Sequence, residues 1–97
     1  MDTPALKKIL AEHLWRFAQT IREIDLDDDR VFHEMLQFAF RYCDVDRGEM
    51  CRELKVSRGT LSKWSTAKIA PHMMVRPVIA QWIGQRVTSK VVELQNE

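Results

Sequence analysis

The chain has 97 residues, of which 45% are hydrophobic and 30% charged, and its formal net charge is +1. This composition excludes a disordered chain and supplies enough apolar material for one modest core, so residues 1–97 are predicted to form a single domain. No apolar run approaches the ~18 residues that a membrane span needs and no signal peptide is visible, so we expect a cytoplasmic protein without membrane contact.

Few glycines and prolines interrupt a chain rich in Leu, Met, Ala, Glu, Arg and Lys. These residues favour helix, and no alternating strand pattern competes with them. We therefore expect an all-α fold, a compact five-helix bundle that contains a helix-turn-helix. Cys43 and Cys51 stand apart from each other and from clustered histidines, so they predict buried thiols and no disulfide or zinc site. No metal or cofactor is expected.

The first predicted helix begins at Pro4, is capped by Thr3 and runs to about Ile24. Apolar residues recur along it three and four positions apart, as in a heptad seam: Leu6, Leu10, Leu14, Phe17, Ile21 and Ile24. Such a seam must be covered. A second helix of the same chain is the slightly favoured cover, and a second copy of the chain is the alternative.

Residues 25–29, DLDDD, predict an acidic loop that caps the next helix, and they lack the glycine and glutamate of an EF-hand loop. The helix over residues 30–43 is apolar nearly all round, which is typical of a central helix packed on several sides. Its adjacent His33 and Glu34 project in different directions without a nucleophile at useful spacing. We therefore expect no enzyme.

Residues 47–66, RGEMCRELKVSRGTLSKWST, predict two short helices joined by a tight turn. Asp46 is placed to cap the first helix and Ser57 the second. Met50, Cys51 and Leu54 form the inner face of the first helix. Leu61 and Trp64 form the inner face of the second, while its outer face is polar and carries Arg58, Gly59, Ser62, Lys63 and Thr66.

This stretch resembles the helix-turn-helix of Cro/Xre-type repressors. The matching features are a small residue within the first helix (Cys51), an aliphatic residue after the turn (Val56), and an apolar inner face on the second helix (Leu61 and Trp64). The resemblance implies a DNA-binding domain whose second helix enters the major groove. The family usually has glycine at the turn, where this chain has Lys55, and a positive φ there costs roughly 1 kcal/mol.

The last predicted helix begins between Pro71 and Pro77, and its core stripe is Val78, Ile79, Trp82, Ile83 and Val87. Met73 and Met74 are predicted to fill gaps in the core. The domain thus divides into an N-terminal helix and acidic loop (1–29), a helix-turn-helix core (30–90) and a tail (91–97). In the tail, Val91, Val92 and Leu94 continue the helix or pack on a partner.

The charges are unevenly distributed. Residues 47–90 hold nine Lys and Arg against two Glu, whereas residues 1–46 hold six against ten Asp and Glu. The net charge alone argues against a nucleic-acid partner, but a basic half that carries the helix pair favours one DNA-facing side. A solvated charged face is the alternative interpretation.

We therefore predict a sequence-specific double-stranded DNA-binding transcriptional regulator. Arg58 and Lys63 are the expected readers of bases and phosphates, with support from Ser57, Gly59, Thr60 and Ser62 and backbone contacts from Arg47, Lys68 and Arg76. A homodimer is expected, because the operators of the resembled family are two-fold. The alternative is a protein-interaction or antitoxin-like adaptor module with a protein partner.

Overall fold

The computed structural model describes residues 4–96, which form five α-helices and contain no strand. They are α1 (Pro4–Ile21), α2 (Asp29–Tyr42), α3 (Arg47–Leu54), α4 (Arg58–Ser65) and α5 (Arg76–Gln95). The predicted all-α fold of five helices is confirmed. None of these helices combines the length and the apolar character that crossing a bilayer requires.

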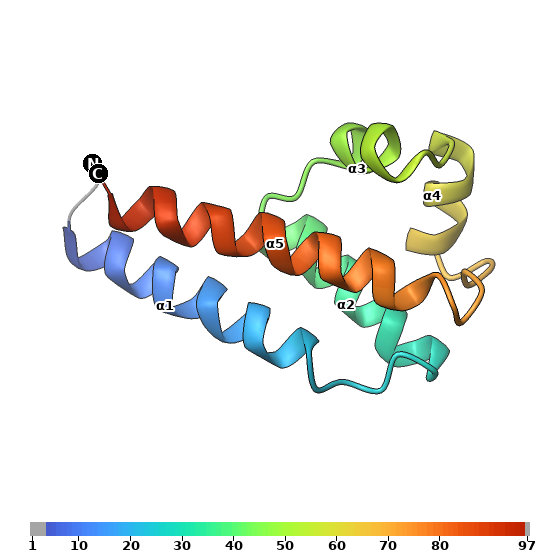
Figure 1. The fold of residues 1–97 in the computed structure, drawn as a ribbon, viewed down its shortest axis with the longest axis horizontal. Helices are drawn as coiled ribbons and strands as arrows, with labels where there is room; N and C mark the ends of the chain where they lie inside the picture. The colour runs from blue at the N-terminus through green and yellow to red at the C-terminus, as the bar shows by residue number, and fades with distance from the viewer. Residues whose placement is uncertain (1–3, 97) are drawn as a thin grey trace.

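The two longest helices, α1 and α5, lie side by side and antiparallel along the long axis of the molecule (Figure 1). The short helices α3 and α4 lie on the other side of α5 from α1, near the beginning of α5. The helix pair predicted to bind DNA is therefore separated from α1 by the rest of the core.

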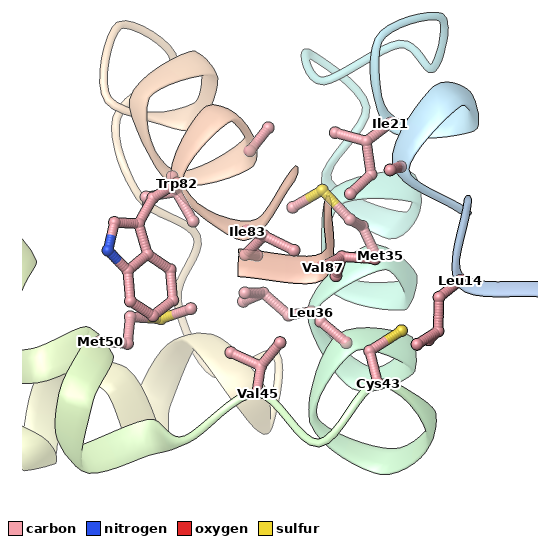
Figure 2. Close-up of a cluster of buried hydrophobic side chains, with 14 of the residues drawn as sticks. Leu14, Ile21, Met35, Leu36, Cys43, Val45, Met50, Trp82, Ile83 and Val87 are labelled. Carbon is pink, nitrogen blue, oxygen red and sulfur yellow. The ribbon is translucent and has the colours of Figure 1, made fainter. Parts of the chain in front are cut away.

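The core is one cluster to which every helix contributes buried side chains. Leu36 of α2 and Ile83 of α5 are fully buried at its centre, and Leu14 of α1 closes it on one side (Figure 2). Met50 of α3 and Trp82 of α5 point toward one another on the opposite side. The apolar faces of α3 and α5 thus fix the position of the short helix pair on the bundle.

The predicted seam of α1 is right at Leu14 and Ile21, with Phe17 and Ile24 partly buried beside them, and wrong at Leu6 and Leu10, which are exposed. The residues buried against the core are Ala11, Leu14, Ala18 and Ile21, whereas the predicted seam residue Leu10 is exposed. Two of the four buried residues are alanines, whose small side chains allow α5 to approach closely. The helix also ends at Ile21, three residues before the predicted end. Its predicted cap, Thr3, lies outside the described residues.

The acidic loop caps α2 as predicted. The Asp28 carboxylate accepts hydrogen bonds from the backbone N–H groups of Arg30, at 2.9 Å, and Val31, at 3.4 Å. The prediction that α2 is packed on several sides is wrong for its outer face. Phe38 is half-buried against Phe17 of α1, and Tyr42, at the end of α2, is 57% exposed.

α5 begins within the predicted interval, with Pro77 in its first turn. Met73 and Met74 do not fill the core, and Met74 is 80% exposed, because the segment between α4 and α5 runs over the surface. Val78 is exposed as well, in contrast to the rest of the predicted stripe. The helix continues to Gln95, so the predicted tail belongs largely to α5.

Both cysteines are buried free thiols, as predicted. Burial raises the pKa of the Cys43 thiol to about 12. Since the thiolate is the reactive form of cysteine, Cys43 is chemically protected in the folded protein.

Candidate nucleic-acid interface

The first helix of the candidate site, α3, is defined by its caps. The Asp46 carboxylate accepts a hydrogen bond of 2.9 Å from the backbone N–H of Gly48. At the other end, Lys55 adopts the left-handed conformation, with φ 58° and ψ 45°, and the N–H of Val56 donates to the carbonyl of Cys51 at 3.1 Å. This is the hydrogen-bond pattern that often follows a C-terminal glycine, here formed around a lysine.

The left-handed Lys55 leads to a stability prediction. Lys55→Gly should raise the free energy of unfolding by roughly 0.5 kcal/mol, because it removes the steric penalty on the Cβ and this gain exceeds the added entropy of the unfolded chain. Lys55→Ala is the matched control, since it removes the charge but keeps the Cβ, and no gain is expected. Urea denaturation of wild type and the two variants measures both effects. If Lys55→Gly clearly lowered the free energy of unfolding, it would contradict a steric penalty at Lys55.

The second helix, α4, is capped as predicted. The Ser57 hydroxyl oxygen accepts a hydrogen bond of 3.0 Å from the N–H of Thr60, and the Ser57 hydroxyl donates to Thr60 Oγ1 at 2.9 Å. Leu61 and Trp64 are buried on its inner face. Ser57 and Thr60 therefore fix the start of α4, while its two large apolar residues hold it on the core.

The end of α4 is held by two polar side chains of α2. Gln37 donates its amide N–H to the carbonyl of Ser65, and His33 Nδ1 lies 3.4 Å from the carbonyl of Trp64. The Gln37 amide thus gives a partner to one of the carbonyls that a helix leaves unpaired in its last turn. The sequence contains a signal for them, since two polar residues four positions apart interrupt an otherwise apolar helix. The spacing alone does not show which helix these two side chains contact.

The outer face of α4 is open. Arg58, Gly59, Ser62, Lys63 and Thr66 are all exposed, and Lys68 is exposed just beyond the helix. The backbone N–H of Lys68 donates to the carbonyl of Lys63 at 3.0 Å, which keeps the two lysines near each other. No acidic residue occurs in the sequence between Glu53 and Glu93. The face therefore combines positive charge with small side chains.

Arg58 does not extend straight from α4 but lies over the first turn of α3. Its Nη2 atom is 3.4 Å from the position that a Cβ would occupy on Gly48, and Nη1 of Arg52 is 3.6 Å from the same point. Asp46 Oδ1 lies 3.4 Å from the same point, so the two guanidinium groups gather around the carboxylate that already caps this helix N-terminus. Sequence reasoning missed Arg52 and Gly48.

Arg47 is exposed, and its guanidinium also contacts residues of α2 and α4. Its guanidinium carbon lies 4.4 Å from the centre of the Phe40 ring, and its Nη1 donates to Ser65 Oγ at 3.3 Å. These contacts join the start of α3 to α2 and α4. The side chain remains exposed enough to meet a phosphate, which stays a prediction.

The prediction that Arg76 contacts the DNA backbone is wrong. Arg76 is 4% exposed, and all its guanidinium nitrogens have partners within the chain. Nε donates to the carbonyl of Pro71 at 2.9 Å, Nη1 to the carbonyl of Leu26 at 2.8 Å, and Nη2 to the Asp29 carboxylate at 2.6 Å. The guanidinium also lies over the ring of Phe32. Arg76 is a buried structural residue whose guanidinium faces the protein interior.

A polar cluster between α3 and α5 supports the site from behind. Trp82 donates its indole N–H to Glu53 Oε1 at 3.1 Å, and Arg86 pairs with Glu53 and, through Nε at 2.7 Å, with Glu49. The hydrogen bond from Trp82, together with the positive charges of Arg86 and Arg52, holds the pKa of Glu53 below its ordinary value of 4.5.

This shift predicts a dependence of stability on pH. Because the pKa of Glu53 is lower in the folded than in the unfolded chain, its contribution is fully present above the unfolded value and is lost as the pH falls through the folded value. Glu53→Gln removes the charge and should therefore narrow the difference in unfolding free energy between about pH 7 and about pH 3. Urea denaturation of wild type and Glu53→Gln at the two pH values measures this difference. If the substitution left the difference unchanged, it would contradict the lowered pKa of Glu53.

No group of three or more His, Cys, Asp or Glu side chains suitable for a metal ion occurs in residues 4–96. Comparison of the chain with models of protein families, with curated proteins and with solved structures finds no match. The resemblance to Cro/Xre-type repressors therefore depends on the residues of α3, the turn and α4 alone.

Proposed function

We propose that this chain is a sequence-specific double-stranded DNA-binding transcriptional regulator that places α4 in the major groove. The observation that supports it best is the open, basic face of α4, with Arg58 and Lys63 among small side chains. A major groove about 12 Å wide admits a helix with such a face. The caps and buried residues of α4 would present it as a rigid unit, which reduces the entropy lost on binding.

The residues take different roles in this proposal. Lys63 and Arg58 contact bases and phosphates, and Gly59 and Ser62 allow a close approach. Ser57 and Thr60 act mainly through the helix cap. Arg52 is exposed beside Arg58 and adds a second positive charge near the start of α3, next to the Asp46 carboxylate.

The experiment is a selection of bound sequences from random duplexes, followed by titration of the selected site with three variants. Arg58→Ala should cost about 1–3 kcal/mol of binding free energy and relax the base preference at one position. Lys68→Ala should weaken all sequences alike and lower the salt slope by about one unit. Lys8→Ala, on α1 and away from the site, is the control and should change nothing.

Two results would contradict the proposal at different levels. Equal, sequence-independent losses from Arg58→Ala and Lys68→Ala would remove Arg58 as a base reader. A complete lack of salt-dependent duplex binding would exclude the function itself.

The second candidate is a protein-interaction module of the adaptor type, and one observation favours it. The segment between α4 and α5 and the start of α5 expose several large apolar side chains: Ile69, Met73, Met74, Val75 and Val78. Flexible methionines are common on surfaces that bind protein partners. If Met74→Ala left duplex binding unchanged, the segment would not be needed to bind DNA. It could then contact a protein partner while α4 is bound to DNA.

A further inference from the structure

α1 carries apolar side chains on two faces, and only one of them packs against α5. The other face, together with α2, forms an apolar groove of about 420 Å³. His13, Phe17, Thr20 and Ile24 line it from the α1 side, and Val31, Met35 and Phe38 line it from α2. Beyond the groove, Ile9 is 62% exposed on α1 and Tyr42 is exposed on α2. The apolar strip therefore extends past the groove at one end.

The floor of the groove is ordered by contacts among aromatic rings. The ring of Phe38 lies with its centre 4.6 Å from that of Phe17, 5.0 Å from that of Tyr42 and 5.6 Å from that of His13. Such tilted contacts are favourable beyond the area that they bury. The groove is thus preformed, so an occupant would not have to order its walls.

The two walls carry opposite charges. Arg16 lines the groove from α1 and Glu34 lines it from α2, and both side chains are exposed. Neither forms an ion pair or a side-chain hydrogen bond within residues 4–96. A two-fold axis that runs along the groove places the α1 wall of each copy opposite the α2 wall of the other, so Arg16 of each copy would face Glu34 of its partner. The surface is therefore complementary to itself in charge.

We propose that the groove between α1 and α2 is the surface through which two copies of this chain associate as a two-fold dimer. The apolar strip supplies the buried area, and the two reciprocal Arg16–Glu34 pairs fix the register and exclude a displaced arrangement. This inference does not depend on DNA binding, because the groove contains none of the residues proposed to contact DNA.

The test uses charge reversal and mixing, followed by sedimentation equilibrium of the full chain. Arg16→Glu puts two acidic groups on each groove and Glu34→Arg puts two basic groups there, so each variant alone should dissociate at least about tenfold more readily. An equimolar mixture of the two should recover association, because each acidic groove then meets a basic one. Lys8→Glu reverses a charge on α1 outside the groove and should leave the dimer unchanged.

Mixing separates a contact between copies from a contact within one chain. Recovery in the double variant Arg16→Glu/Glu34→Arg without recovery in the mixture would mean that the pair acts within one chain, and it would overturn the proposal. A monomer at millimolar concentration, or single reversals no more dissociated than Lys8→Glu, would also overturn it. Circular dichroism of each variant checks that it is folded. If a single reversal unfolds the chain, the double variant, which keeps one charge of each sign on the groove, still tests the pair.

Discussion

Arg76→Leu is expected to lower the free energy of unfolding by about 2–4 kcal/mol. The substitution leaves the carbonyls of Pro71 and Leu26 without their donor, and an unsatisfied buried polar group costs about 1–3 kcal/mol. The Asp29 carboxylate adds little, because it is 73% exposed and regains water when the guanidinium is lost. Urea denaturation measures the loss.

Arg86→Leu is the matched control, since Arg86 is also a paired arginine of α5 but is much more exposed. It should cost no more than about 1 kcal/mol. Arg76→Lys should lie between wild type and Arg76→Leu, because a lysine keeps the charge and cannot reach three partners with fixed geometry. Equal losses from Arg76→Leu and Arg86→Leu would mean that burial of Arg76 does not matter for stability.

Leu61→Ala is expected to destabilise the fold by about 2–5 kcal/mol, the range for a buried leucine that leaves a cavity. Leu61 is buried beneath α4 and does not reach its outer face. DNA affinity measured well below the melting temperature should therefore fall much less than stability does. Thermal and urea denaturation give the first quantity, and titration of the selected duplex gives the second.

Val78→Ala is the control for Leu61→Ala, because Val78 is a large apolar residue on an exposed surface. It should change stability by less than about 0.5 kcal/mol. A loss from Leu61→Ala as small as this, accompanied by loss of DNA binding, would place Leu61 on the outer face and show that the helix phase is wrong.

Local features were predictable from the sequence because their causes lie within a few residues. The helix caps involve hydrogen bonds within one helical turn, at Asp28, Asp46 and Ser57. The positive φ of Lys55 likewise depends on the turn that directly follows α3. The inner face of α4 was also predictable, since its spacing leaves a single apolar stripe. For the same reasons the sequence predicted which residues of α4 face outward.

Features that depend on distant partners were not predictable. α1 offers two apolar stripes, and the choice between Leu10 and Ala11 is decided by the close approach of α5, which no local pattern contains. Arg76 looks like an ordinary surface cation in the sequence. Its burial depends on a carbonyl 50 residues away, at Leu26, and on an acid 47 residues away, at Asp29.

α2 touches both proposed binding surfaces with neighbouring side chains. His33 and Gln37 hold the end of α4, while Glu34 and Phe38, each the next residue in the chain, line the groove against α1. A ligand on one surface that shifts α2 changes the free energy of binding at the other. Thermodynamic linkage makes this coupling reciprocal, so any factor by which self-association tightens DNA binding is the factor by which DNA tightens self-association.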